Sequence, residues 1–395
     1  MATTESTDIA APARALPART DRVGKLRGIV LAMLAGAVFG AAGVMAGRAA
    51  KGADWLGQRF DALNAFDLLL LPATFFVVIL LHELGHLAGG FARGMRFMLL
   101  IVGPLRLRRT VSGLRLDWFL RGDTFGGLAA AMPHPQRPAR GQLLALCLGG
   151  PLVSLLLAVL ALWLSDITGG RWSAHLLILG GMSATIFLAT AIPIRAGGFL
   201  SDGRQCLELL RGGSAVEQRA MLTAAYAQSL SGVRPRDRDP APLERALALR
   251  GEEPMRDVAA ALMAYQCALD RRDLAAAGEW IDRVAAGHDD YPPGFRQSLA
   301  CDIAYFSARY RRDPATAAAW YARAKGGVVE PSQRALTEAA IALAGGDALL
   351  ALQAIARAEK RLGDSSEAGS IPFLQDELSS LRVEAEAALA HHAGA

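Results

Sequence analysis

The sequence contains little cysteine, and what it has is scattered. Its 395 residues include four cysteines, at positions 147, 206, 267 and 301, and no two of them form a CxxC pair. This spacing excludes a disulfide framework and a structural zinc cluster, and the thiols fit a protein that faces a reducing cytosol. The sequence also lacks an obvious nucleotide-binding motif.

Acidic residues are scarce where the chain is most basic. Between Arg93 and Arg140 there are nine arginines and only two acids. A basic stretch of this kind can bind nucleic acid, but these arginines flank long apolar runs. A membrane-topology signal explains them better, so we expect no nucleic-acid partner.

Long runs without charge are abundant, and 52% of all residues are hydrophobic. An α-helix rises about 1.5 Å per residue and a bilayer core is about 30 Å thick, so runs near this length can span it. The first run could also be a signal peptide, but it is long for one and starts far from residue 1. The runs predict four transmembrane helices, at residues 28–47, from 68 to the HELGH motif at 82–86, at 143–164 and at 172–194.

Positive charge follows the positive-inside rule. Five Lys and Arg residues precede the first run, nine arginines separate the second from the third, and Arg195 follows the fourth. Only the loop with Arg48, Lys51 and Arg59 weakens the pattern. We therefore expect a multi-pass integral protein of a bacterial cell membrane, with the N- and C-termini in the cytoplasm.

Composition divides the chain into four regions. The fold class that follows is a membrane all-α protein of about four transmembrane helices, with a small cytoplasmic-side β-hairpin and a soluble α-helical repeat-like C-terminal domain. The regions are a disordered cytoplasmic tail at 1–27, a transmembrane domain at 28–212, a linker at 213–242 with a charged, proline-containing stretch at 232–242, and a helical tetratricopeptide-like domain at 243–390.

The hairpin is predicted from alternating residues on either side of Ser112-Gly113. LRLRRTV at 105–111 and LRLDWFL at 114–120 both alternate apolar and polar side chains. Such a pattern around a Ser-Gly pair is typical of a β-hairpin. It offers an edge for an extended peptide to pair with, or it only covers the ends of the helices.

The C-terminal region contains a loose internal repeat. Asp273, Asp313 and Asp347 each follow a basic or glycine turn and start an Ala-rich helical pattern. The related segments WIDRVAA, WYARAKG and AIARAEK begin seven residues later, at Trp280, Trp320 and Ala354. Stacked helical hairpins similar to tetratricopeptide repeats are expected, and such arrays bind partners. The domain therefore recruits a cytoplasmic protein partner, or it is a purely structural cap.

The motif HELGH at 82–86 contains the candidate metal-binding and catalytic residues. His82 and His86 stand at i and i+4, so both imidazoles lie on one face of a helix. Two such nitrogens can bind one Zn²⁺, and Glu83 can reach a water on the metal as general base. A charged group at the centre of a membrane helix costs about 2.5–3.5 kcal/mol, so such residues persist where they pair or bind something.

The combination of HELGH, GGP at 149–151 and FLSDG at 199–203 resembles the site-2 protease family of intramembrane zinc metalloproteases. The resemblance covers residues 65 to about 210. It implies zinc as cofactor, His82, His86 and Asp202 as ligands, and Glu83 as catalytic base. It also implies hydrolysis of peptide bonds in or near the transmembrane helix of a membrane-protein substrate.

Three features depart from the family pattern. Ser154 stands where the family has Asn after GGP, and Thr190 stands where Asn is expected before Pro193. The stretch from Pro193 to Asp202 is also longer than usual, so the chain must turn back through Gly197-Gly198 for Asp202 to reach the metal. Otherwise Asp202 is the N-cap of a cytoplasmic helix. Weaker candidate ligands are Asp117, Asp123 and His134.

Three functions compete on this evidence. The first is an active intramembrane protease whose helical domain recruits or gates substrates. The second is a non-proteolytic zinc-binding membrane scaffold that acts through the helical domain, and the changes at Ser154 and Thr190 motivate it. The third, a metal transporter, is weakest because four apolar runs carry only one ligand cluster.

Overall fold

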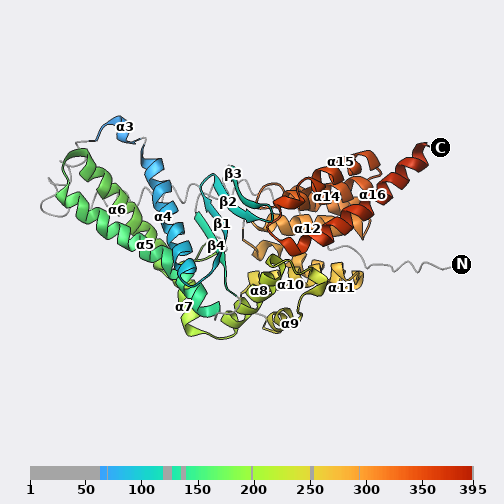
Figure 1. The fold of residues 1–395 in the computed structure, drawn as a ribbon, viewed down its shortest axis with the longest axis horizontal. Helices are drawn as coiled ribbons and strands as arrows, with labels where there is room; N and C mark the ends of the chain where they lie inside the picture. Colours follow the sequence, from blue (N-terminus) through green and yellow to red (C-terminus); the bar gives the residue numbers. More distant parts are fainter. Residues whose placement is uncertain are drawn as a thin grey trace. The chain divides into compact units, whose positions relative to one another are not determined.

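The computed structural model covers most of the chain (Figure 1). The tail predicted at 1–27, the apolar run at 28–47 and Asp123 lie outside the described residues. By its internal contacts the chain divides into two compact units, one with Ile79–Val153 and Phe187–Ala395, the other with Ser154–Ile186 and the segment that ends at Val78. The described residues are 63–68, 70–118, 127–134, 139–196, 199–249, 253–292 and 294–393.

Three described helices are long and apolar enough to cross a membrane. They are α4 (Leu70–Ala92), α5 (Ala139–Ile167) and α6 (Gly170–Ala191). They match the second, third and fourth predicted runs. Along α5 the side chains of Leu156, Val159 and Trp163 are each more than half exposed. An apolar face of this kind suits lipid better than water, which supports membrane association.

The second unit is held together by small and hydroxyl side chains. The Ser183 hydroxyl donates to the backbone carbonyl of Ser154 at 2.8 Å, which joins α6 to α5. A Cβ at Gly180 would lie 2.9 Å from Cγ of Leu162, so the helices approach closely there. Small residues and interhelical hydrogen bonds are the usual means of helix association in lipid. Before α4 this unit also contains the short helix α3 (Ala65–Leu68).

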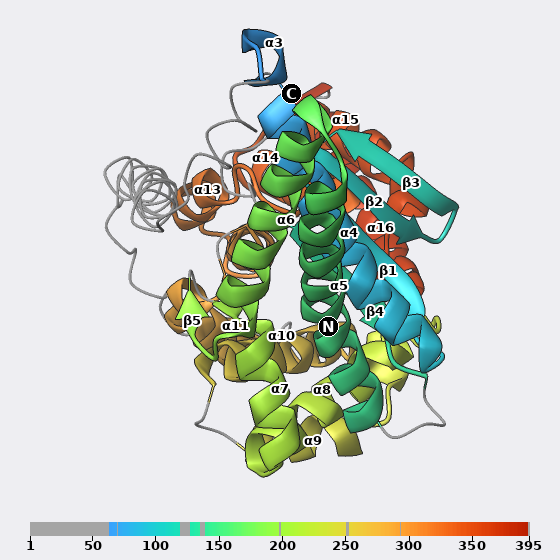
Figure 2. The same cartoon turned by 90° about the vertical axis from the view of Figure 1, so that its left-hand side faces the viewer.

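Between α4 and α5 the chain forms an antiparallel sheet of four strands in the order β3-β2-β1-β4 (Figure 2). The hairpin predicted around Ser112-Gly113 is confirmed as β2 and β3. The other two strands were not predicted, because β1 reads RFMLLIV without alternation and β4 reads GLAAAM with small side chains. The strands are β1 (Arg96–Val102), β2 (Leu105–Thr110), β3 (Gly113–Trp118) and β4 (Gly127–Met132).

The C-terminal half is an array of helical hairpins in the first unit. The predicted helix starts are confirmed, since Asp273, Asp313 and Asp347 each accept a hydrogen bond from the backbone N–H three residues later. The core of the array is rich in Ala, Leu and aromatic side chains. Its helices are α9 (Ala241–Ala248), α10 (Pro254–Asp270), α11 (Leu274–Ala286), α12 (Arg296–Arg309), α13 (Pro314–Arg323), α14 (Pro331–Ala344), α15 (Ala348–Glu359) and α16 (Ile371–Ala393).

The linker expected at 213–242 is mostly helical. Helix α8 (Ser214–Leu230) fills its first half, and a 3-10 turn at Pro235–Asp237 lies in the second. Leu222 of α8 joins a buried cluster with Ala246 and Ala260 of the array. Burial of this apolar face orders α8, whereas the charges and prolines that suggested a linker lie at residues 232–242.

Candidate metal centre

The helix α4 presents His82, Glu83 and His86 inside the first unit. All three side chains are buried, with at most 7% of each residue exposed. The i, i+4 spacing brings the two imidazoles together, and their Nε2 atoms are 3.1 Å apart. The sequence-predicted pair therefore forms as expected from helix geometry.

Asp202 reaches these histidines by the turn that the sequence requires. Helix α6 ends at Ala191, a short hairpin of β5 (Arg195–Ala196) and β6 (Phe199–Leu200) follows, and α7 (Asp202–Arg211) begins. Residues 197–198, through which the chain was expected to turn back, lie outside the described residues. Asp202 is not the N-cap of the helix, because Ser201 caps α7 by accepting from the backbone N–H of Arg204. The Asp202 carboxylate is thus left to face the histidines.

The three side chains make a set of ligand atoms that fits one metal ion. Asp202 Oδ2 lies 3.4 Å from Nε2 of His82 and 3.4 Å from Nε2 of His86. A tetrahedral zinc ion bonded at about 2.0–2.1 Å places neighbouring ligand atoms about 3.3–3.4 Å apart. Among the residues that the structure describes, these three are the one group of His, Cys, Asp or Glu side chains found in such proximity.

A hydrogen bond to the backbone fixes the orientation of the His86 ring and of its possible metal-ligand atom. His86 Nδ1 lies 2.7 Å from the carbonyl oxygen of Leu146, so Nδ1 carries a proton and donates it. In the neutral imidazole Nε2 then presents a lone pair to the Asp202 oxygen. A lone pair on nitrogen and a carboxylate oxygen repel each other, so this arrangement is stable when a cation lies between them.

Glycines allow the helices around the site to pack closely against one another. A Cβ at Gly149 would lie 2.1 Å from the carbonyl oxygen of Gly85, so α4 and α5 are in backbone contact. A Cβ at Gly150 would lie 2.3 Å from His86 Nε2, and one at Gly203 would lie 1.8 Å from the carbonyl oxygen of Ala191. The glycines of GGP and of SDG are therefore required by packing around the ligands.

The edge strand β4 contacts Glu83, a feature that the sequence did not indicate. A Cβ at Gly127 would lie 2.2 Å from Glu83 Oε1. Only a glycine lets the strand approach so closely, and Gly127 was not singled out because nothing in GLAAAM marks a site. Glu83 is thereby held beside the three ligand candidates.

The remaining sequence candidates lie elsewhere. Asp117 accepts from Arg106 at 3.0 Å and from Arg108 at 2.8 Å. Burial would raise the pKa of its carboxyl, but these guanidinium groups hold it below its usual value. The backbone of His134 pairs with the Gln142 amide. Neither residue belongs to the cluster of ligand atoms.

The polar substitutes for the family's Asn residues have local partners. The Thr190 hydroxyl donates to the carbonyl of Phe187 in its own helix at 3.4 Å. Ser154, whose carbonyl accepts from Ser183, lies in the packing of α5 with α6.

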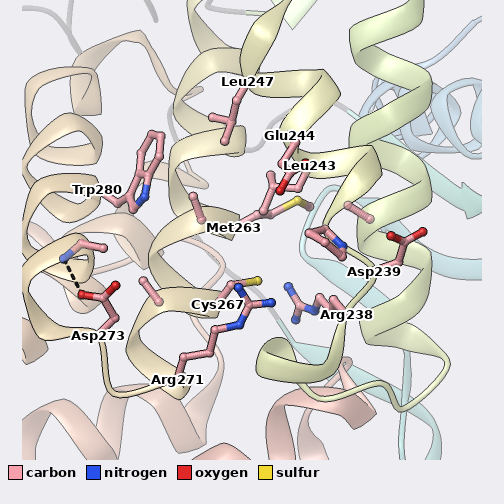
Figure 3. Close-up of a pocket in the computed structure, with 15 residues that line it drawn as sticks. Arg238, Asp239, Leu243, Glu244, Leu247, Met263, Cys267, Arg271, Asp273 and Trp280 are labelled. Carbon is pink, nitrogen blue, oxygen red and sulfur yellow. Dashed lines mark hydrogen bonds between the residues drawn. The ribbon is translucent and has the colours of Figure 1, made fainter.

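The helical array contains a cavity of about 220 Å³ lined by residues of α8 to α11 (Figure 3). Its walls are mainly apolar, with Leu243, Leu247 and Met263 among them. Arg238, buried to 5% exposure, lines the cavity and donates to the Ser229 hydroxyl at 2.8 Å. The residues of the metal cluster are not part of this cavity.

Searches against protein-family models, curated proteins and solved structures found no match for this chain.

Proposed function

We propose that the chain is an intramembrane zinc endopeptidase of the site-2 protease type, which hydrolyses peptide bonds in or near a transmembrane helix of a membrane-protein substrate. The observation that carries the proposal is the convergence of Asp202 of α7 with His82 and His86 of α4, a helix that is apolar enough to span a membrane and that also carries Glu83. Ionisable residues within transmembrane helices usually mark a site that binds an ion or a substrate or that transfers protons.

The residues of the chain divide the chemistry among them. His82, His86 and Asp202 would hold the ion. Zinc, when bound, lowers the pKa of a water to about 7 and polarises the scissile carbonyl. Glu83 accepts the proton of the attacking water and later delivers it to the leaving amine, as a general base and then acid. The close approach of β4 at Gly127 keeps the carboxylate beside the ligand atoms for both transfers.

The sheet supplies a surface for the substrate backbone. The sequence suggested the hairpin as an edge, and β3 is one edge of the sheet. The opposite edge, β4, is the one in contact with Glu83. We propose that an unwound substrate segment pairs along β4, because extended peptides add to sheet edges through main-chain hydrogen bonds.

A second function, a non-proteolytic zinc-binding scaffold, is favoured by two observations. The Thr190 hydroxyl donates within its own helix and Ser154 is buried between α5 and α6, so substrate binding is left to other groups. The helical array also has the cavity of Figure 3 for a cytoplasmic partner. In this case Glu83 has no catalytic role, whereas residues 243–390 are required for cellular function.

Substitution of Glu83 by Gln tests the protease directly. The amide cannot accept the proton of water, so hydrolysis of a transmembrane peptide in proteoliposomes should fall by about 10²–10⁴-fold. Metal analysis of the same detergent-purified preparation should still give one zinc per chain. Glu386→Gln, on the exposed surface of α16, is the matched control and should cleave normally.

Two outcomes would contradict the proposal. Purified wild type without stoichiometric zinc removes its basis. Equal cleavage by wild type and Glu83→Gln assigns the activity to another group. If Glu83→Gln retains cellular function and removal of residues 243–390 abolishes it, the scaffold is the correct alternative.

A further inference from the structure

The turn between β2 and β3 is hydrogen-bonded to the helical array. The backbone N–H of Val111 donates to the carbonyl of Ser365 at 2.9 Å, and that of Ser112 donates to the carbonyl of Gly363 at 3.2 Å. Figure 1 shows β2 and β3 beside the C-terminal helices. Main-chain hydrogen bonds between segments so distant in sequence fix the turn to the loop that follows α15.

Arg108 is the centre of this contact. It is buried to 5% exposure on β2. Its Nη1 donates to the carbonyl of Asp364 at 2.6 Å and to Glu330 Oε2 at 2.9 Å, while its Nε donates to Asp117 of β3 at 2.8 Å. One guanidinium thus joins both strands of the hairpin to two positions of the array. A second arginine of the hairpin, Arg115, also forms an ion pair with Asp364.

The sheet connects this contact to Glu83. Arg108 pairs with Leu99 of β1, and Leu99 pairs with Ala130 of β4. Gly127, the first residue of the same strand, lies against the Glu83 carboxylate. A hydrogen-bonded ladder is stiff across its strands, so the position of the hairpin sets the position of β4. The array is therefore linked to the general base through the paired strands β2, β1 and β4.

We propose that Arg108 is a positioning residue for the reaction, and that the array, through Arg108, sets where the edge strand β4 holds Glu83. The inference rests on the proposed function and adds a means of regulation, because a partner that displaces the loop at 363–365 would misplace the base. A protein ligand of the array would then control hydrolysis at a distance from the metal centre. The contacts at Arg108, Val111, Ser112 and Arg115 are called the hairpin clamp below.

The first variant, Arg108→Gln, weakens the hairpin clamp without leaving a carboxylate unpaired. In Arg108→Gln, Asp117 keeps its hydrogen bond from Arg106, and Glu330 keeps the N–H of Ser366. We expect kcat to fall roughly tenfold or more with KM nearly unchanged, since small misplacements of a catalytic group have effects of this order. Hydrogen exchange of the amides at 127–132 should become faster, and the zinc content should stay at one per chain. Arg382→Gln, which removes an exposed ion pair with Glu359, is the matched control.

A disulfide across the clamp provides the reverse test. A Cβ at Gly363 would lie 3.8 Å from Cβ of Ser112, which is the usual separation in a disulfide, about 3.5–4.5 Å. The four native cysteines are buried. Ser112→Cys with Gly363→Cys should therefore form a bond on mild oxidation. Added to Arg108→Gln, the oxidised bond should restore kcat and slow exchange at 127–132, and a reductant should reverse both.

The outcomes separate this inference from the proposed function. Unchanged exchange at 127–132 in Arg108→Gln overturns the inference, as does faster exchange with unchanged kcat in an active enzyme. Loss of zinc in this variant would also overturn it, because the effect would then be on the metal centre as a whole. If wild type cleaves nothing, the proposed hydrolysis fails, yet exchange that rises in Arg108→Gln and is restored by the disulfide still supports the mechanical link to Glu83.

Discussion

Arg272, Arg312 and Gly346 occupy the same place in three successive helical hairpins, directly before the capping aspartate. All three have positive φ, at 64°, 52° and 83°. A left-handed conformation costs a residue with a side chain about 1–2 kcal/mol, whereas glycine adopts it freely. The turn of the repeat therefore prefers glycine, and two of the three repeats carry an arginine there.

We predict that Arg312→Gly stabilises the protein. Arg312 is exposed, so the substitution relieves backbone strain and should gain about 0.5–1 kcal/mol in the free energy of unfolding after the flexibility of glycine in the unfolded chain is counted. The measurement is the thermal midpoint of the purified chain in detergent.

Arg272→Gly is the control for this prediction. Its strain is relieved as well, but Arg272 lies 2.5 Å from the buried carboxylate of Glu377 and donates to the Tyr310 hydroxyl at 2.9 Å. The loss of these contacts should cancel the gain or exceed it. Equal stabilisation by both variants would show that the contacts of Arg272 add nothing to stability, and an unchanged midpoint in Arg312→Gly would show that strain at this turn does not limit it.

At the scale of elements, the contact of α4 with α5 decides where the histidines lie. Gly85 and Gly149 bring the two backbones together, and Gly150 leaves room for the ring of His86. Close approach through glycine is characteristic of helix pairs in membranes. The ligand geometry thus depends on residues that bind nothing themselves.

We therefore expect Gly149→Ala to weaken zinc binding. The added Cβ would meet the carbonyl oxygen of Gly85, a backbone atom that cannot turn away, so the helices must separate. Overpacking of this kind costs about 1–3 kcal/mol, which corresponds to roughly a tenfold loss of zinc affinity or more if it falls on the site. Competition with a fluorescent chelator measures the affinity.

The control is Gly181→Ala in α6, where a Cβ would have no atom within 4 Å. It also lies in a candidate span and adds the same methyl group. Normal zinc affinity in Gly149→Ala would mean that the contact of α4 with α5 does not set the ligand geometry.

Elements with a strong local signal were predictable from the sequence. The apolar runs gave α4, α5 and α6, the alternation around Ser112-Gly113 gave β2 and β3, and three aspartates marked helix starts. The i, i+4 spacing gave the His82 and His86 pair. Each of these depends on neighbours within a few residues, which periodicity and capping describe.

What remained hidden depends on contacts between distant segments. The strand β4 has small side chains and becomes a strand by pairing with β1. The role of Gly127 follows only from its approach to Glu83. Helix α8 was mistaken for a linker because its buried face is recognised only against the array. Tertiary pairing and burial of this kind override local composition.

At the scale of the molecule, the proposed metal centre would tie α7, and the array that follows it, to α4. His82 and His86 come from one segment of the first unit and Asp202 from another, far along the chain. An ion that binds only this folded arrangement stabilises it by mass action. Zinc is therefore expected to act as a structural link as well as a cofactor of the proposed reaction.

Removal of zinc should accordingly lower the thermal midpoint of the whole chain. With free zinc at about 1,000 times its dissociation constant, the ion stabilises the folded state by about 4 kcal/mol. A chelator should remove this increment from wild type. It should have little effect on Asp202→Asn, because an amide oxygen carries no charge for the ion and the third ligand is lost. Asp376→Asn, a carboxylate that is half exposed on α16, should respond to the chelator as wild type does. An equal response of Asp202→Asn and wild type would place the third ligand elsewhere, and α7 would then be joined to α4 by packing alone.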